Sequence, residues 1–339
     1  MDVLLFRSDV YALHYNCSPT FFNESKYTIE ERKHVLLGVV ILFAYVLFTV
    51  LYVLVVFGML AYEHRHLASY KLMLQLSFIH IVGLQASGGV TGVLAIEGAI
   101  FCTHPTLIYV FGCVGLATWC GSTFTNMLLG INRCCELYGN GLADRLFSGL
   151  RIYIWMSIPL VYMLYVFFYS QPPLYSGIQM AWFFNPFYGY FDDFGIIYHS
   201  SIHSINNLFV CVTELMIYST LIALYMRATA LASPEIPNSL RREKRIVLIG
   251  VVHFVASTCY VGMQFISVNF FTTLTASTFY LLSQGLPGVI YLCVNRSIRR
   301  TLRGKFGRQK KWTHEHVSES DDSTVATHIL FTKCLNLHQ

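Results

Sequence analysis

Charged side chains are scarce in this chain and missing from long stretches of it. Only 12% of the 339 residues are Asp, Glu, Lys or Arg, against about 25% in an ordinary soluble domain. Hydrophobic residues make up 55% and recur in long blocks along the chain rather than in one half of it. A large soluble helical protein needs charged faces between its buried helices, so the composition excludes that class.

The first residues also lack the pattern of a cleavable signal peptide. Such a peptide needs a basic start and about 7–15 apolar residues. Here Asp2 is acidic, and Arg7 and Asp9 interrupt the apolar run. We therefore expect the first membrane span to act as the targeting signal.

Seven stretches are long and apolar enough to cross a bilayer, which takes about 20 residues. Glu214 is the single Asp, Glu, Lys or Arg within them. The sequence therefore predicts an all-α, multi-pass membrane protein, a bundle of seven transmembrane helices. The predicted spans are Val35–Tyr62, Leu72–Ile96, Thr106–Asn132, Ile152–Tyr169, Ser204–Met226, Ile246–Ile266 and Ala276–Val294.

The direction of the spans follows from the basic residues, which stay on the cytoplasmic side. Only four of the 23 Lys and Arg residues precede the first span, and the three loops on that side have none. This predicts an extracellular N-terminus and a cytoplasmic C-terminus. Two glycosylation triplets, at Asn16 and Asn23, fall in the segment predicted to be outside. A third triplet, at Asn295, is discounted because it sits at the inner membrane face.

Four regions follow from these boundaries. We predict an extracellular segment at 1–34 and the membrane domain at 35–294. Residues 295–308 carry Ile298, Leu302 and Phe306 at helical spacing with bases between them, a pattern typical of an amphipathic helix on the membrane surface. Residues 309–339 are polar and predicted to be a disordered cytoplasmic tail.

Only two of the ten cysteines, Cys17 and Cys102, fall on the predicted outer side, where disulfides persist. The second outer loop, 170–203, contains no cysteine. Any extracellular disulfide must therefore join Cys17 to Cys102. The same loop holds seven aromatics between Trp182 and Phe191. They form a belt at the membrane interface, the interpretation that we favour slightly, or a lid over a pocket, and both can hold together.

Signals of catalysis are few. One H-x-x-x-H pair, His199 and His203, has no second histidine box beside it, so we predict no metal site and no cofactor. No phosphate loop or nucleophile elbow is present, and we predict neither an enzyme nor a nucleic-acid-binding protein. A transporter and a ligand-gated channel subunit remain as alternatives to a receptor for an unknown small molecule or peptide.

Four motifs together resemble the nematode serpentine receptors of class T, which are chemoreceptor-type G-protein-coupled receptors. They are LLGINRCCEL, FCTHPTLIYVFGCVGLATWC, WFFNP and LPGVIYLCVNRSIRR. The resemblance runs from about Cys17 to Arg303. It implies a rhodopsin-like bundle, a heterotrimeric G protein as partner, and residence in the plasma membrane or a sensory cilium.

The resemblance also assigns a switch. Asn132, Arg133 and Cys134 occupy the place of the acid–Arg–Tyr motif of rhodopsin-like receptors. Since Asn132 is neutral, we expect no local carboxylate to hold Arg133 in the inactive state. Pro287 and Tyr291 match the hinge of the seventh span, although the tyrosine comes four residues after the proline instead of three. That span has no lysine, which excludes an opsin.

The buried acid needs a partner, because an ionisable residue in a membrane is costly. Depth along the helices brings Glu214 near His253, and we predict an intramembrane polar pair between them. The alternative is a neutral Glu214 bonded to Asn207 or to a hydroxyl such as Ser257.

The tail carries hydroxyl residues among acids, at Ser318, Ser320, Ser323 and Thr324. If these are phosphorylated, the added charge suits an arrestin-like partner. A tail that only solvates the chain end is the simpler interpretation.

Overall fold

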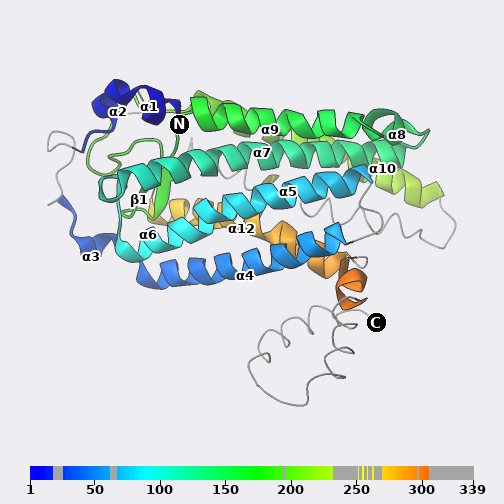
Figure 1. Cartoon of the computed structure of the whole chain (residues 1–339), viewed down its shortest axis with the longest axis horizontal. Helices are drawn as coiled ribbons and strands as arrows, with labels where there is room; N and C mark the ends of the chain where they lie inside the picture. Colours follow the sequence, from blue (N-terminus) through cyan, green and yellow to red (C-terminus); the bar gives the residue numbers. More distant parts are fainter. Residues whose placement is uncertain are drawn as a thin grey trace, which may run out of the picture.

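The computed structural model is a bundle of long helices lying side by side (Figure 1). It describes residues 1–17, 26–61, 67–193, 196–231, 269–295 and 298–304, with a few isolated positions between 251 and 262. Within this part, five helices are long and apolar enough to cross a membrane, and a bent pair, Phe270–Cys293 with Ile298–Gly304, supplies a sixth. The predicted span Ile246–Ile266 lies almost entirely outside the described residues, as does the predicted tail.

Among the described residues, the observed helices match the predicted spans or extend beyond them. Helices α4 (Val35–Leu60) and α9 (Arg151–Tyr169) agree with the prediction to within two residues. The other long helices overrun it: α7 (Pro105–Tyr138), α10 (Ser201–Leu231) and α12 (Phe270–Val294). At 1.5 Å per residue α7 is about 51 Å long, whereas the bilayer core is about 30 Å thick. Hydropathy marks only the part of a helix that the core covers.

The second span is broken by a wider turn. It runs from α5 (Ala68–Leu84) through a π-helix, η2 (Gln85–Val90), into α6 (Thr91–Glu97). The Thr91 hydroxyl donates to the Ala86 carbonyl at 2.7 Å and so pairs an acceptor inside the wider turn. Turns of this kind are frequent at functional sites.

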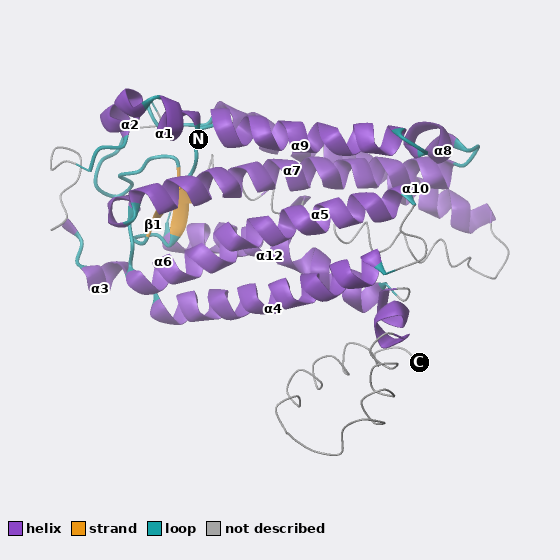
Figure 2. Cartoon of the chain, in the orientation of Figure 1, coloured by secondary structure: helices purple, strands orange, loops and turns teal. Residues whose placement is uncertain are grey.

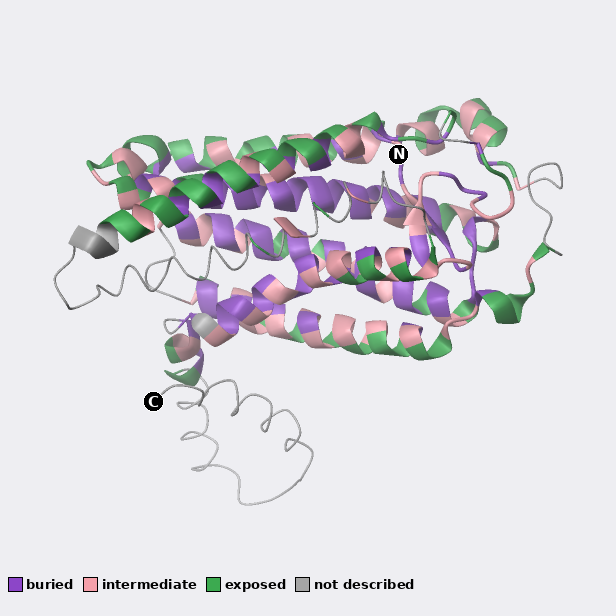
Figure 3. Ribbon diagram, turned by 180° about the vertical axis from the view of Figure 1, so that it is seen from behind, coloured by how far each residue is buried: buried purple, intermediate pink, exposed green. Residues whose placement is uncertain are grey.

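Burial separates the helices into a central one and outer ones (Figure 3). Helix α7 is buried along most of its length, while α4 and α9 present apolar side chains to the outside. Leu36 on α4 is 78% exposed and Val161 on α9 is 64% exposed. Such continuous apolar faces are typical of helices that contact lipid.

One end of the bundle, here called the hairpin end, is closed by short elements (Figure 2). They are the antiparallel strands β1 (Leu174–Ser176) and β2 (Ala181–Phe183), the helices α1 (Asp2–Phe6), α2 (Ser8–His14) and α3 (Ile29–Arg32), and the 3-10 turn η3 (Phe101–Thr103). A disulfide between Cys17 and Cys102 joins the N-terminal segment to η3 across 85 residues. The predicted pairing is confirmed.

The opposite end, here called the tail end, carries α8 (Leu142–Phe147) and the helix Ile298–Gly304. Ile298 and Leu302 are fully buried, and both lie against Gly58 of α4. Arg299 donates to the carbonyls of Leu292 and Cys293, near the C-terminus of α12. The described part of the predicted apolar face therefore packs on protein instead of facing the membrane, and Phe306 lies outside the described residues.

Candidate functional site: a pocket and a buried arginine on one helix

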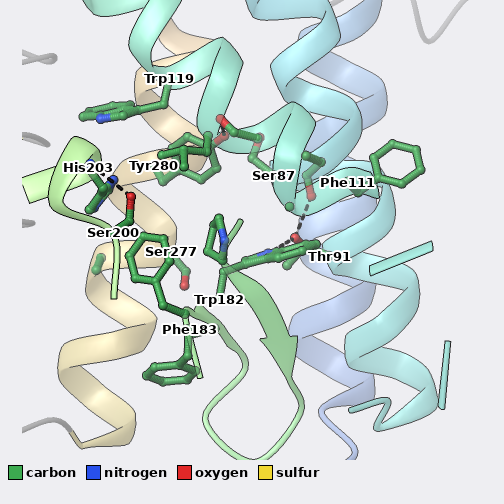
Figure 4. A pocket seen from close by; sticks show the side chains of 18 of the residues that line it. Ser87, Thr91, Phe111, Trp119, Trp182, Phe183, Ser200, His203, Ser277 and Tyr280 are labelled. Carbon is green, nitrogen blue, oxygen red and sulfur yellow. Dashed lines mark hydrogen bonds between the residues drawn. The ribbon is translucent and has the colours of Figure 1, made fainter. Parts of the chain in front are cut away.

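A cavity of about 340 Å³ opens at the hairpin end, between α7, α10, α12, the π-helix and the β1–β2 hairpin (Figure 4). Seven aromatic side chains contribute to its wall, and eight hydroxyl or imidazole side chains are interspersed among them. Within the described part of the chain, the lining contains no Asp, Glu, Lys or Arg. The aromatics are Phe111, Trp119, Trp182, Phe183, Phe184, Tyr198 and Tyr280, and the polar residues are Ser87, Thr91, His199, Ser200, His203, Ser204, Thr273 and Ser277.

A hydrogen bond joins the hairpin to the first residue of α6, directly after the π-helix. The Trp182 indole N–H donates to the Thr91 hydroxyl at 2.9 Å (Figure 4). Tyr175, fully buried on β1, packs edge-on against the Trp182 ring with centroids 5.6 Å apart. The start of the aromatic loop thus lines a pocket, as in the lid interpretation. That the loop also rests at the membrane interface stays a prediction. Phe191, at the end of the loop, is exposed.

Two hydrogen bonds in series determine the protonation state of His203 at the pocket wall. The Trp119 indole N–H donates to Asn207 Oδ1 at 2.8 Å. The amide nitrogen of Asn207 is therefore the group 2.9 Å from His203 Nε2, and it must donate. His203 then accepts through Nε2 and carries its proton on Nδ1, so the imidazole is neutral. Within the described residues no group of three metal-ligating side chains exists, and this histidine belongs to the pocket.

Tyr198 connects the pocket rim to the N-terminal segment. Its hydroxyl donates to the His14 carbonyl at 2.5 Å. Burial, with the nearby Asp193 carboxylate, raises the pKa of Tyr198 to about 12. The phenol therefore stays neutral at physiological pH and keeps its donor role. Asp193 in turn accepts from the Tyr198 backbone N–H at 2.7 Å.

Deeper in the bundle, Glu214 is fully buried on α10 and bonded to α7. The Asn126 amide donates to Glu214 Oε1 at 2.9 Å. Asn207, which we considered as the partner, bonds to Trp119 instead, so that alternative is wrong. His253 and Ser257 lie outside the described residues. Sequence offered no signal for Asn126, because only the packing of α7 against α10 brings the two side chains together.

At the tail end of α7, Asn132 and Arg133 are both buried. The guanidinium of Arg133 donates to the carboxylate of Glu136 on the next turn of the same helix. The expectation that no local carboxylate holds Arg133 is therefore wrong. The signal was present, since residues three apart on a helix are neighbours.

The remaining switch residues face neighbouring helices. Cys134 lies with its thiol 3.6 Å from the Ile217 carbonyl on α10. Pro287 lies inside α12 without ending it. Tyr291, one turn further, is buried and close enough to Arg133 to interact with it electrostatically. Arg133 and Tyr291 thus lie within electrostatic range, and no hydrogen bond joins them among the described residues.

A second cavity, of about 570 Å³, lies at the tail end between α5, α7, α8 and α9. Asn132, Arg133 and Glu136 form part of its wall, together with Lys71 and Asp144. In contrast to the pocket at the hairpin end, this wall is charged.

This chain resembles known proteins both in sequence and in fold. The family described as "Serpentine type 7TM GPCR chemoreceptor Srt" matches residues 4–315. "Serpentine receptor class T-55" of Caenorhabditis elegans is 22% identical over 234 residues, which cover 68% of this chain and 63% of that protein. The crystal structure of squid rhodopsin superposes with a TM-score of 0.62 at 14% identity, over 95% of this chain and 96% of that one.

The likeness to squid rhodopsin shows the fold, a rhodopsin-like bundle of seven helices. The family match covers most of the sequence, including all four motifs that carried the resemblance. The chain is a multi-pass membrane protein and belongs to the serpentine 7TM chemoreceptor family Srt.

Proposed function

We propose that this chain is a chemosensory receptor that binds an extracellular ligand in the pocket at the hairpin end and activates a heterotrimeric G protein at the tail end. The observation that carries the proposal is that α7 belongs to both sites. Gly115 and Trp119 line the pocket, and Arg133 and Glu136 line the cavity at the other end. Gly115 and Arg133 are about 27 Å apart at 1.5 Å per residue.

A ligand shifts a conformational equilibrium only through different contacts in the two states. A ligand whose contacts with α7 differ between the two states would displace this helix. The displacement would reach the neighbouring helices, because α7 packs against α5, α9 and α10. A small displacement of α7 at Trp119 changes the surroundings of Arg133 without any chemical step. This supports a signalling receptor.

The tail-end surface suits a protein partner that approaches from the cytoplasm. Besides Arg133, the helix Ile298–Gly304 contributes Arg299, Arg300 and Arg303. Part of this positive charge serves to attract anionic lipid, at about 1 kcal/mol per residue. Arg133 differs, because it is buried in the bundle. The basic cluster 241–245 and the tail hydroxyls that would recruit an arrestin-like partner lie outside the described residues.

The test is G-protein activation by purified receptor in lipid nanodiscs, measured as basal nucleotide exchange at rising receptor density. Arg133→Ala is expected to abolish receptor-dependent exchange and leave receptor yield unchanged. Arg145→Ala is the control, because Arg145 is exposed on α8 at the same end. Exchange that survives in the Arg133 variant would remove this residue from coupling. Ion currents or saturable uptake that persist under G-protein blockade would instead favour a channel or a transporter.

A further inference from the structure

The pocket at the hairpin end is suited to an uncharged ligand. None of its described lining residues is an acid, a lysine or an arginine. His203 is neutral because its Nε2 accepts from Asn207. A charged ligand would lose its hydration in this pocket and gain no counter-ion from the described wall.

The size of the cavity limits the ligand further. A volume of 340 Å³ lies at the lower end of the ~300–1,000 Å³ typical of ligand pockets. A small ligand with one or two rings fits. The flat rings in the wall, among them Trp119 and Tyr280 in edge-on contact at 5.9 Å, favour a ligand that itself contains a ring.

The hydroxyl of Ser87 in the pocket wall is buried without a hydrogen-bond partner among the described residues. Ser87 lies on the π-helix η2 and is only 5% exposed. The neighbouring hydroxyls are paired: Thr91 with Trp182 and Ala86, Ser200 with Ser170. A buried hydroxyl without a partner is costly, and a polar atom on the ligand would pair it.

We propose that the receptor recognises a small, neutral, ring-containing molecule with one hydroxyl or carbonyl group, which Ser87 binds. This inference rests on the proposed function and adds the chemical class of the ligand and the residue that selects it. The rival is an organic cation, because aromatic walls also attract cations.

Four probes of the same ring size separate these classes: β-naphthol, naphthalene, β-naphthoate and trimethyl(naphthyl)ammonium. Their affinities are measured on the full-length receptor in nanodiscs from the ligand-dependent rise in melting temperature. Naphthol is expected to bind about ten times more tightly than naphthalene, the ratio for one hydrogen bond gained in a buried site. Both charged probes are expected to bind least. Tightest binding of the ammonium probe, or of the carboxylate, would overturn the proposal.

A pair of variants tests the selecting residue. Ser87→Ala should reduce the preference for naphthol over naphthalene to about twofold or less, because the variant cannot form the hydrogen bond to the naphthol hydroxyl. Ser77→Ala is the control, since Ser77 is equally buried on α5 but bonds the Met73 carbonyl and is not part of the pocket wall. A naphthol preference that survives in Ser87→Ala would contradict the role of this residue.

These binding measurements need no G protein. If naphthol binds as expected and the receptor still fails to drive nucleotide exchange, the proposed function fails and the ligand class stands. If the receptor couples while a charged probe binds best, the ligand class fails alone.

Discussion

The pair between Arg133 and Glu136 lies within α7 and does not cross to another helix. Arg133 is 5% exposed at its side chain and Glu136 is 36% exposed. A pair with one partner this open to solvent contributes at most about 1 kcal/mol. It can bias the position of the guanidinium, but it does not lock two helices together.

We therefore expect Glu136→Gln to raise basal nucleotide exchange about two- to fivefold, because ~1 kcal/mol corresponds to about a fivefold change in an equilibrium. Exchange is measured at matched receptor amounts. Glu97→Gln, which removes an acid paired with His104 at the hairpin end, should leave it unchanged. A basal rate at or below that of the unmodified receptor would show that Glu136 does not restrain Arg133.

The bond between Asn126 and Glu214 links α7 to α10 inside the membrane domain. Hydrogen bonds between membrane helices contribute about 0.6 kcal/mol on average and up to ~1.7. Asn126→Ala should lower the apparent melting temperature by about 2–4 °C, the shift for ~1 kcal/mol in a domain of this size. Thermal unfolding in nanodiscs gives the measurement.

Glu214→Gln keeps the acceptor oxygen and should cost less than Asn126→Ala. The double variant should be no less stable than Asn126→Ala alone, because both changes act on one bond. Fully additive losses would mean that the two side chains act separately. Whether His253 also contacts Glu214 stays a prediction, since it lies outside the described residues.

At the scale of elements, the hairpin covers the pocket from outside the helices. Its two strands pair over three residues each, Ser176 forms a bridge to Ile100, and one indole hydrogen bond joins the hairpin to Thr91, the first residue of α6. The π-helix itself was not predicted. The segment QASGGV gave only two adjacent glycines as a sign of irregular backbone, and nothing in it specified a wider turn.

Trp182→Phe keeps an aromatic ring but removes the N–H that reaches Thr91. We expect bound naphthol to dissociate several-fold faster from this variant, because a weakened lid opens more often. Thr91→Val should have a similar effect, and the double variant should be no faster than the faster single one. Rapid dilution of the labelled probe gives the rate.

Trp155→Phe is the matched control for that experiment. The Trp155 indole also donates one hydrogen bond, to the Leu146 carbonyl, but near α8 at the tail end. Equal dissociation rates in the unmodified receptor and in all four variants would show that the hairpin does not limit ligand exit.

For the whole molecule, we propose that the hairpin end faces outward. The disulfide between Cys17 and Cys102 lies at this end, which suits an oxidising compartment. Asn16 lies at the same end, and Asn23 is outside the described residues.

We expect Asn16 and Asn23 to carry N-glycans and Asn295 to carry none. Asn295 is 2% exposed and lies at the tail end. Glycosidase treatment should shift the mobility of the receptor, each Asn→Gln change at 16 or 23 should reduce that shift, and Asn295→Gln should leave it intact. A glycan on Asn295, or a tail epitope stained on unpermeabilised cells, would reverse the orientation.

Within the described residues, the sequence by itself determined where the chain crosses the membrane, and it determined the disulfide. Apolar length decides insertion residue by residue, because the bilayer core offers no partner for a charged group. The first predicted span and α4 both begin at Val35, and the fourth predicted span and α9 both end at Tyr169. No cysteine other than Cys17 and Cys102 lies on the predicted outer side, so no other pairing was available there.

Only the tertiary structure decided which polar groups meet. Asn126 and Glu214 are 88 residues apart, and Trp119 and Asn207 are equally distant in the chain. Periodicity cannot rank such pairs, since any buried amide could serve the same acid. The packing of α7 against α10 selected these pairs. The tertiary structure also places Ser87 of η2 in the pocket wall, with no protein partner among the described residues.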